Sequence, residues 1–231
     1  MLKPLVSVII VNWNGQQLLD DCLRSLTKST YKNLEIFFVD NASKDDSVQY
    51  VKKNYKDIKI IQNTENLGYA EGHERAFKQS KGEFVLLLST DTIINPNVVE
   101  TLVKVMVTDK NLGAVMPKLL MYPKKHLIDS LGAFFLMNGD LYHFGREKDP
   151  KSAKYNKQMY ILSVKGACTL FRKEALEKTG MFDKDYFAYF EETDLSMRTW
   201  LAGYRLLYVP EATVYHKGGV TSAKMQRSYI L

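Results

Sequence analysis

The stretch EFVLLLSTDTIINP, residues 83–96, changes from apolar to polar at its middle. The unbroken apolar run FVLLL predicts a strand that is covered on both of its faces. Two small polar residues and then Asp91 follow this run directly. Further on, Asn95 would cap a helix whose first position is Pro96. A buried strand that is followed by a helix is one unit of an α/β sheet, so we expect Asp91 at the carboxyl end of a strand.

The same strand-helix unit recurs upstream of this stretch. Apolar, β-branched runs predict strands over 5–11, 34–40 and 58–63. Between them, the leucines of 17–26 share one helical face, Ser43 with Asp46 resembles a capping box, and a third helix is expected to end near Ser80. Four such units in series favour an α/β fold with a Rossmann-like, doubly wound, mostly parallel sheet.

The second half of the chain is less regular. Its patterns predict a strand over 161–172, a short helix that ends at Gly180, an acidic-headed helix over 190–203, and late strands over 204–210 and 212–216. No linker composition separates the two halves. We therefore expect residues 1–115 and 116–231 to be two halves of one domain, the second contributing a smaller subregion.

The composition is ordinary for a globular protein, since 45% of the 231 residues are hydrophobic and 25% are charged. No apolar run approaches the length of about 20 residues that spans a bilayer, and no signal peptide is visible. Cys22 and Cys168 lie inside apolar patterns, which indicates buried free thiols and a cytoplasmic location. The net charge of +6 suits phosphates or an anionic membrane face, or merely a solvated surface. No basic block indicates nucleic-acid binding.

The predicted strands end on polar or small residues. In a doubly wound sheet, ligands bind beyond the carboxyl ends of the strands. Those ends carry Asn12, Trp13 and Asn14 after the first strand, Asp40 and Asn41 after the second, Asn63 after the third, and Ser89, Thr90 and Asp91 after the fourth. We expect these side chains to converge on one ligand site.

Seven segments follow one another along nearly the whole chain: VSVIIVNWNG, FFVDNAS, NTENLGYAEGHERA, LLLSTDT, GACTLFRKEAL, FEETDLSMR and YHKGG. In this order they resemble the signature blocks of family 2 glycosyltransferases, in particular the rhamnosyltransferase-like branch. The resemblance implies a GT-A fold, a nucleotide-diphosphate sugar as donor, a divalent metal ion (Mn²⁺ or Mg²⁺) and inversion at the anomeric carbon. It also implies that residues 1–115 bind the donor and that 116–231 bind the acceptor and carry the catalytic base.

For the donor, the resemblance implies that Trp13 stacks on the base, a contact worth about 1–3 kcal/mol, and that Asp40 accepts a hydrogen bond from the base or ribose. The residues alone also allow Trp13 to pack on the next helix and Asp40 to be a turn residue. Gly68 would let the backbone approach the donor, and Arg75 would meet a phosphate or be a solvated helix residue. The expected donor-binding set is completed by Asn12, Asn14, Asn41, Ser89 and Thr90.

For the metal ion, the resemblance implies Asp91 as the last acid of an Asp-x-Asp-like motif. Ser89 and Thr90 stand where other members carry acids, so a ribose contact and strong metal binding are less well supported. His216, in YHKGG, would be a second metal ligand, and imidazole suits Mn²⁺ better than Mg²⁺. Without the resemblance, Asp91 could be a turn residue and His216 a structural histidine.

For catalysis, three acids open the predicted helix over 190–203: Glu191, Glu192 and Asp194. Acids at a helix start are also favoured by the helix dipole alone. The family pattern maps the general base onto Glu192, with Glu191 as the next candidate. Asp194 is expected to orient Arg198 or a backbone amide.

The combined interpretation is an inverting, metal-assisted glycosyltransferase that uses a glycan or lipid-linked glycan as acceptor at the cytoplasmic face of a membrane. One alternative is a sugar-nucleotide binding module without activity, which the residues Ser89 and Thr90 leave open. The other is a nucleotidyltransferase-like enzyme on a related sheet. The first strand is followed neither by Gly-x-Gly-x-x-Gly nor by a Walker loop, which argues against this second alternative.

Overall fold

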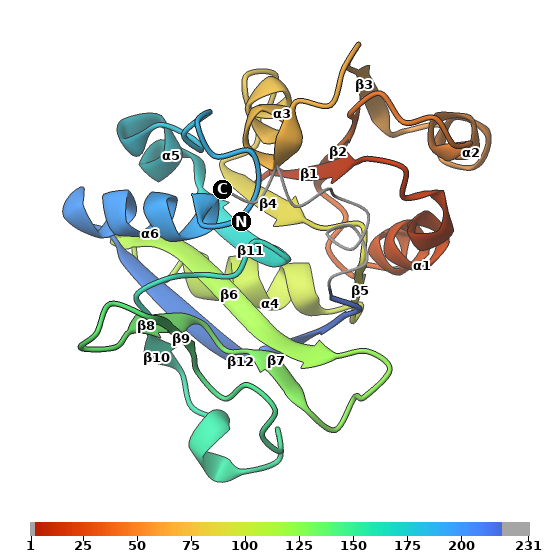
Figure 1. Ribbon diagram of the computed structural model, residues 1–231. Coiled ribbons are helices and arrows are strands. Elements are labelled where there is room, and N and C mark those ends of the chain that lie inside the picture. The colour runs from red at the N-terminus through yellow and green to blue at the C-terminus, as the bar shows by residue number, and fades with distance from the viewer. Residues whose placement is uncertain (1–2, 219–231) are drawn as a thin grey trace.

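The computed structural model describes residues 3–218, and its first half confirms the predicted alternation of strands and helices (Figure 1). Strands β1 to β4 are Val6–Asn12, Leu34–Asp40, Lys59–Gln62 and Phe84–Leu88, and helices α1 to α3 are Gln16–Thr27, Ser47–Asn54 and Gly68–Phe77. β3, β2, β1 and β4 are neighbours in that order, and each pair is parallel. These four strands form the parallel half of the sheet.

The second half extends the same sheet with mixed pairing. Its elements are β5 (Thr92–Ile94), α4 (Val98–Met106), β6 (Leu112–Met121), β7 (Ile128–Ser130), β8 (Ala133–Phe135), β9 (Leu141–His143), η1 (Ala153–Tyr155), β10 (Met159–Tyr160), β11 (Cys168–Arg172), α5 (Lys173–Thr179), α6 (Glu191–Leu201) and β12 (Arg205–His216). The main path of the sheet runs β10-β12-β6-β11-β4-β1-β2-β3. β11 is antiparallel to β4 and β6, whereas β12 is parallel to β6. The division expected after residue 115 falls inside β6, so both halves of the chain share that strand.

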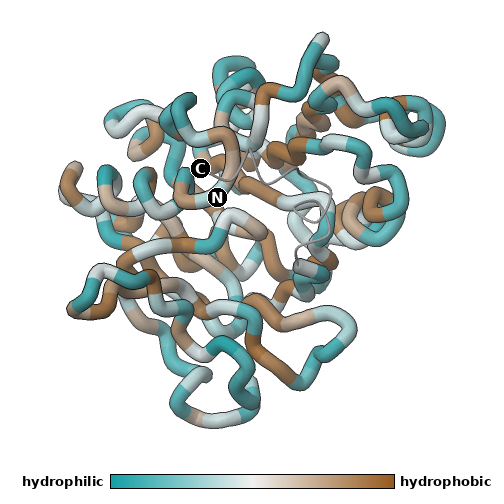
Figure 2. The backbone as a smooth tube through the Cα atoms, viewed as in Figure 1, coloured by the Kyte–Doolittle hydropathy of each residue, from teal (hydrophilic) through white to brown (hydrophobic). Residues whose placement is uncertain are grey.

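The core lies between this sheet and its helices. All five side chains of β4 are buried, as are nearly all those of β1, because both strands run through the middle of the sheet. Figure 2 shows apolar (brown) segments in these central strands and in other strands of the same sheet. α4 and α6 pack on opposite faces of the part of the sheet that contains β6 and β12 (Figure 1).

Two predicted helix starts are wrong. Asn95 does not cap a helix, because the residues before it form β5, which pairs with β12, and α4 begins only at Val98. Ser43 does not cap α2, which begins at Ser47 with Asp46 in the N-cap position and without a side-chain cap bond. In both cases the polar residue or its neighbours form long-range contacts, and these contacts override the local preference for a helix start.

The strands of the second half also differ from the prediction. The strand expected over 161–172 is confined to β11, and the two late strands are one strand, β12. The register of β12 against β6 shifts between Val209 and Thr213. Pro210 lies within this shift, and a proline has no N–H group for the ladder, so the strand continues past it through an irregularity.

Two bulk predictions can be compared with the fold. Cys22 and Cys168 are free and buried, as predicted. Within residues 3–218, no helix is long and apolar enough to cross a membrane.

Candidate active site

A cavity of about 270 Å³ opens at the carboxyl ends of β1 and β4, beside the first turn of α6. This is the edge of the sheet at which the sequence predicts a ligand site. The residues that line it are Val11, Trp13, Asn41, Asn66, Gly68, Tyr69, Ser89, Thr90, Asp91, Lys165, Gly166, Ala167, Ala188, Tyr189, Glu191, Glu192 and His216. Residues from both halves of the chain therefore meet in one cavity.

His216 lies between two carboxylates at this cavity. Its Nδ1 atom is 2.8 Å from Oδ2 of Asp129, and its Nε2 atom is 3.4 Å from Oδ2 of Asp91. The pairing of β5 with β12 sets this arrangement, because it places Thr92 opposite His216 and so brings Asp91 beside the imidazole. The amide of Lys217 also donates to the carbonyl oxygen of Asp91, at 2.8 Å. The position of Asp91 is thus fixed by one contact to its side chain and another to its main chain.

The three side chains shift one another's ionisation. Burial alone lowers the pKa of His216, but the hydrogen bonds to Asp129 and Asp91 outweigh this effect and raise its pKa to about 9. Burial raises the pKa of both carboxyl groups, but the hydrogen bond and the charge of His216 bring each pKa below its ordinary value. With no other cation present, the stable state at neutral pH is an imidazolium between two carboxylates.

The donor atoms fit a divalent metal ion. Oδ1 of Asp91 is buried and has no hydrogen-bond partner. Asp129 holds Nδ1 of His216, which leaves Nε2 directed toward Asp91, and a carboxylate that orients a histidine in this way is typical of metal sites. Within the described part of the chain, no three His, Cys, Asp or Glu side chains could hold a metal by themselves. Asp91 and His216 could therefore supply two ligands, and substrate oxygens or water would supply the rest.

The first turn of α6 brings two acids into the cavity. Tyr189 and Phe190, which precede it, have φ values of 72° and 65°, a left-handed backbone that bulky residues rarely adopt. After this turn, Glu191 and Glu192 both contribute to the cavity lining. Oε2 of each glutamate is buried without a hydrogen-bond partner. Strained backbone and unpaired buried acceptors are features that cluster at functional sites.

Glu191 is the more deeply buried of the two acids, with 5% of its surface exposed. Burial, and after it the charge of Glu192, raise its pKa to about 8, while the nearby cation of Lys165 acts in the opposite direction. Glu191 is therefore mostly protonated at neutral pH. In that state it can donate a hydrogen bond, but it is poorly suited to accept a proton.

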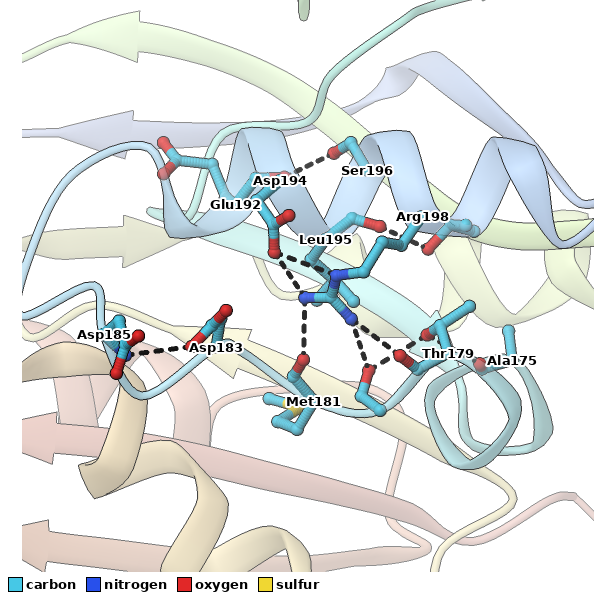
Figure 3. A network of polar contacts seen from close by, with 12 residues as sticks. Ala175, Thr179, Met181, Asp183, Asp185, Glu192, Asp194, Leu195, Ser196 and Arg198 are labelled. Atoms are coloured by element: carbon cyan, nitrogen blue, oxygen red, sulfur yellow. Dashed lines mark hydrogen bonds and ion pairs between the residues drawn. The ribbon is translucent and has the colours of Figure 1, made fainter.

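Asp194 is not among the residues that line the cavity, and it binds Arg198, as predicted (Figure 3). Its Oδ2 atom accepts hydrogen bonds from Nε and Nη2 of Arg198, at 2.9 and 2.6 Å. The same guanidinium donates to the carbonyl oxygens of Thr179, Gly180 and Met181. The ion pair thus ties α6 to the segment that follows α5, and Figure 3 shows the Glu192 carboxylate outside this network.

Several residues that were predicted for the donor line the cavity: Trp13, Asn41, Gly68, Ser89 and Thr90. The side-chain Nδ2 of Asn41 donates to the carbonyl oxygen of Gly68, and its Oδ1 accepts a hydrogen bond from Nδ2 of Asn63. Gly68 has a φ of 72°, and a Cβ atom there would clash with the carbonyl oxygen of Phe187. Only glycine allows the loop before α6 to approach α3 this closely.

Asn12, Asn14 and Asp40 are not part of the cavity lining. Nδ2 of Asn12 donates to Oδ1 of Asp40 and to Oγ of Ser43, and Oδ2 of Asp40 accepts from the amide of Ser43. Oδ1 of Asn14 accepts from the amide of Lys44. These bonds link the ends of β1 and β2, next in the sequence to the cavity residues Trp13 and Asn41.

Arg75 lies on the exposed face of α3. It forms an ion pair with Glu71 at 3.4 Å, one helical turn away. It is not part of the cavity lining, and its surroundings are those of a solvated helix arginine. Gly219, the last residue of the YHKGG segment, lies outside the described residues.

Asp129, Lys165 and Tyr69 are among the residues of the site that were not anticipated from the sequence. Asp129 lies within the apolar run LIDSLGAFF, where a buried carboxylate needs a partner, and that signal could have indicated a site residue. Lys165 interrupts the apolar pattern of ILSVKGACTLFR in the same way. The hydroxyl of Tyr69 donates to the carbonyl oxygen of Gly166 across the cavity wall, a contact that no local pattern indicates.

Relatives of the chain can be recognised along its whole length. It is 24% identical to N-acetylglucosaminyl-diphospho-decaprenol L-rhamnosyltransferase of Mycobacterium tuberculosis. The matched region is 253 residues long and covers 99% of this chain and 81% of that protein. It is 23% identical to poly-beta-1,6-N-acetyl-D-glucosamine synthase of Staphylococcus aureus, over 90% of this chain but only 48% of the synthase. The chain therefore spans about half of the second relative.

Solved structures share the fold. GalNAc-T7, crystallised with UDP, GalNAc and Mn²⁺, superposes with a TM-score of 0.75 at 17% identity, over 92% of this chain and 44% of that one. The mannosyltransferase PcManGT of Pyrobaculum calidifontis, in complex with GDP-Man and Mn²⁺, superposes with a TM-score of 0.69 at 21% identity, over 99% and 59%. These likenesses identify the fold as GT-A. A model of glycosyl transferase family 2 matches residues 7–180, which is well over half of the chain, and the protein is therefore a glycosyltransferase that belongs to this family.

Proposed function

We propose that the protein moves a sugar from a nucleotide-diphosphate donor to a glycan or lipid-linked glycan, by a single displacement that inverts the anomeric carbon. One observation carries this proposal: the Asp91–His216–Asp129 group and the two glutamates of α6 meet at the same cavity. The first is suited to the diphosphate end of a donor and the second to an incoming hydroxyl group. No nucleophile relay is needed for a single displacement.

On the donor side, the ring of Trp13 would stack on the base, and the polar groups of Asn41 and Ser89 would contact the rest of the nucleotide. Asp91 and His216 would hold a divalent ion, which when bound offsets the negative charge of the diphosphate leaving group. Asp129 would keep His216 in the orientation that this requires, through the 2.8 Å contact with Nδ1. Asn12 and Asn14 would hold the ends of β1 and β2 together beside these groups, and Asp40 would accept a hydrogen bond from the base or ribose, as expected from the sequence.

On the acceptor side, Glu192 would accept the proton of the attacking hydroxyl group. A positioned general base contributes a rate factor of about 10²–10⁴. Glu191 would be protonated at neutral pH, because its pKa is about 8, and would donate a hydrogen bond to a substrate oxygen. Asp194 would act only through Arg198, by fixing the first turns of α6 relative to the segment after α5.

Lys165 would make the cavity less negative when both substrates are present. It is the lysine that lines a cavity with three carboxyl groups, those of Asp91, Glu191 and Glu192. A nucleotide-diphosphate donor brings further negative charge, so a cation on this wall would favour its binding.

The acceptor is proposed from the relatives. The mycobacterial relative is named for a diphospho-decaprenol acceptor and the staphylococcal one for a polymer of N-acetylglucosamine. We extend the class, a glycan that is free or lipid-linked, to this protein, and place the reaction at the cytoplasmic face of a membrane. The positive net charge supports contact with an anionic lipid surface.

The test measures thermal unfolding with uridine, guanosine and thymidine diphosphates, each with and without Mn²⁺. A ligand at 100 times its dissociation constant stabilises a protein by about 2.7 kcal/mol. We expect one nucleotide to stabilise the wild-type protein only when Mn²⁺ is present, and Asp91→Asn to lose that shift. An unchanged shift in Asp91→Asn would refute the role of Asp91.

Turnover separates an enzyme from a binding module. Wild-type protein should slowly hydrolyse the matching nucleotide sugar with Mn²⁺ and should transfer its sugar when an acceptor is supplied. Glu192→Gln should keep nucleotide binding and lose transfer. Nucleotide binding without any turnover in the wild-type protein would favour the alternative of a module without activity.

A further inference from the structure

The hairpin of residues 133–143, formed by β8 and β9, carries a cluster of apolar side chains that nothing in the described chain covers. Met137 is fully exposed, and Phe135, Leu136 and Tyr142 are between 43% and 49% exposed. Figure 1 places this hairpin at the lower left, apart from the central sheet, and Figure 2 shows apolar (brown) segments at its outer end. Single exposed apolar residues are ordinary, but a contiguous cluster indicates an interaction surface.

The turn of this hairpin is closed by its own hydrogen bonds. The amide of Leu136 donates to the carbonyl oxygen of Asp140, and the amide of Gly139 donates to that of Leu136. Asn138 exchanges side-chain and backbone hydrogen bonds with Asp140. The main-chain N–H groups of Leu136, Gly139 and Asp140 are therefore satisfied within the turn, which lowers the cost of moving it out of water.

The hairpin is anchored at its other end. Ala133 forms a bridge with Ser163, which lies two residues before the cavity residue Lys165. The rings of Phe134 and Phe144 are in edge-to-face contact, and Phe144 contacts Tyr155 in the same way. The apolar tip is thus presented on a rigid base that is connected to the active-site wall.

Positive charge lies beside this base. The segment of residues 146–157, REKDPKSAKYNK, contains five basic and two acidic residues. Lys154 of this segment lies beside the base of the hairpin, since its Nζ atom is 5.5 Å from the centre of the ring of Phe144, the residue that follows β9. Lys151 and Lys157 are exposed on the same segment. An apolar tip whose base lies beside a lysine-rich segment matches the two layers of an anionic membrane surface, acyl chains below and phosphates above.

We propose that the tip of the 133–143 hairpin inserts shallowly into an anionic lipid bilayer while the lysines of residues 146–157 contact its headgroups. Asp140 and Asn138 limit the depth, because a carboxylate and an amide at the turn are costly to bury below the interface. The inference rests on the proposed function, since a lipid-linked acceptor lies in a membrane. It goes further in assigning the contact to one element, and it is tested without donor or acceptor.

The first experiment measures binding of the full chain to vesicles of phosphatidylglycerol and phosphatidylethanolamine, and to vesicles of phosphatidylcholine. We expect binding to the anionic vesicles that weakens as salt is added. The double variant Leu136→Ser/Met137→Ser should reduce the partition coefficient about tenfold or more. The matched control is Leu201→Ser, which removes a leucine that is 84% exposed at the end of α6 and should bind like the wild type.

Two further variants test depth and charge. Met137→Trp should show a blue-shifted emission that brominated acyl chains quench, against the background of the two native tryptophans. Lys151→Gln/Lys157→Gln should weaken binding to anionic vesicles and reduce its dependence on salt. Thermal unfolding of each variant confirms that it is folded.

The proposal is overturned if the hairpin variant and Leu201→Ser bind vesicles equally, or if Met137→Trp is not quenched. It is also overturned if the wild type ignores vesicles but self-associates in the ultracentrifuge through the same residues, since the cluster would then be a contact between copies. Mn²⁺-dependent nucleotide binding should be unchanged in Leu136→Ser/Met137→Ser. A failure of the hairpin proposal can therefore be told apart from a failure of the proposed function.

Discussion

Replacing Glu191 by glutamine should make the protein more stable, and increasingly so as the pH rises. The pKa of Glu191 is raised from 4.5 to about 8 in the folded chain, first by burial and then by the charge of Glu192. Between these two values the folded protein binds a proton that the unfolded chain has lost. The free energy of unfolding of the wild type therefore falls through this pH window. A glutamine has the shape of the protonated acid and cannot ionise.

The size of the effect follows from the shift. A rise of the pKa from 4.5 to about 8 corresponds to about 5 kcal/mol of differential proton binding. Water that enters the open cavity screens part of this, whereas the opposing effect of the Lys165 cation is already contained in the pKa of about 8. We therefore expect Glu191→Gln to be about 2–4 kcal/mol more stable than the wild type above the folded pKa, and nearly equal to it at low pH.

The assay is chemical denaturation of both proteins at several values between about pH 5 and about pH 9, without metal or nucleotide. The control is Glu174→Gln, because Glu174 also lies in the first turn of a helix, α5, but is exposed. The stability difference of the control should be small and should not change with pH in this range. The same variants can be compared for donor hydrolysis at neutral pH.

A pH-independent difference between Glu191→Gln and the wild type would refute the inference that Glu191 is protonated at neutral pH. Loss of stability in the variant would refute it as well, because an ionised Glu191 would then be making favourable contacts. If transfer were abolished by Glu191→Gln and retained by Glu192→Gln, the two roles would have to be exchanged.

Three other predictions concern the supports of the site. Asp129→Asn should weaken Mn²⁺ binding by about 10–100-fold, because His216 loses the carboxylate that orients it; calorimetric titration measures this, and an unchanged affinity would remove Asp129 from the site. Gly68→Ala should destabilise the protein by about 1–3 kcal/mol more than Gly203→Ala, since both glycines have positive φ but only the first would clash with a neighbouring backbone. Equal losses of stability would contradict the close approach of Phe187 to Gly68. Arg198→Gln should lower stability by about 1–3 kcal/mol and reduce kcat more than nucleotide binding, because three carbonyl oxygens and a carboxylate lose their donor; a variant of normal stability would show that the network is not needed.

Much of the fold could be predicted because its first half is made of strong local patterns. The apolar runs that form β1, β2 and β4 are long enough to be read as buried strands, and parallel pairing follows from their alternation with helices. Shorter strands were missed or misjudged. β5 has three residues and exists only because β12 pairs with it, so the local signal at Asn95-Pro96 indicated a helix start two residues too early.

The residues of the candidate site were also predicted only in part. Asp91 was expected at the end of a strand, and His216, Glu191 and Glu192 came from the resemblance to a family, and all four line one cavity. Asp129 was not found, because its partner His216 is 87 residues away in the sequence. Asp40, a strand-end residue like Asp91, is bonded to Asn12 and Ser43 and is not among the residues that line the cavity, so its contact with the base or ribose stays a prediction.

The sequence by itself determined the order of the α/β units and the chemical types at the strand ends, because hydrophobic periodicity and turn chemistry act over a few residues. Tertiary structure alone decided which polar groups face one another and which are buried away from water. That is why the pKa of about 9 at His216 and of about 8 at Glu191 could not be read from the chain. Each depends on burial and on charges, and some of those charges reach the site only through the pairing and packing of strands that are far apart in sequence.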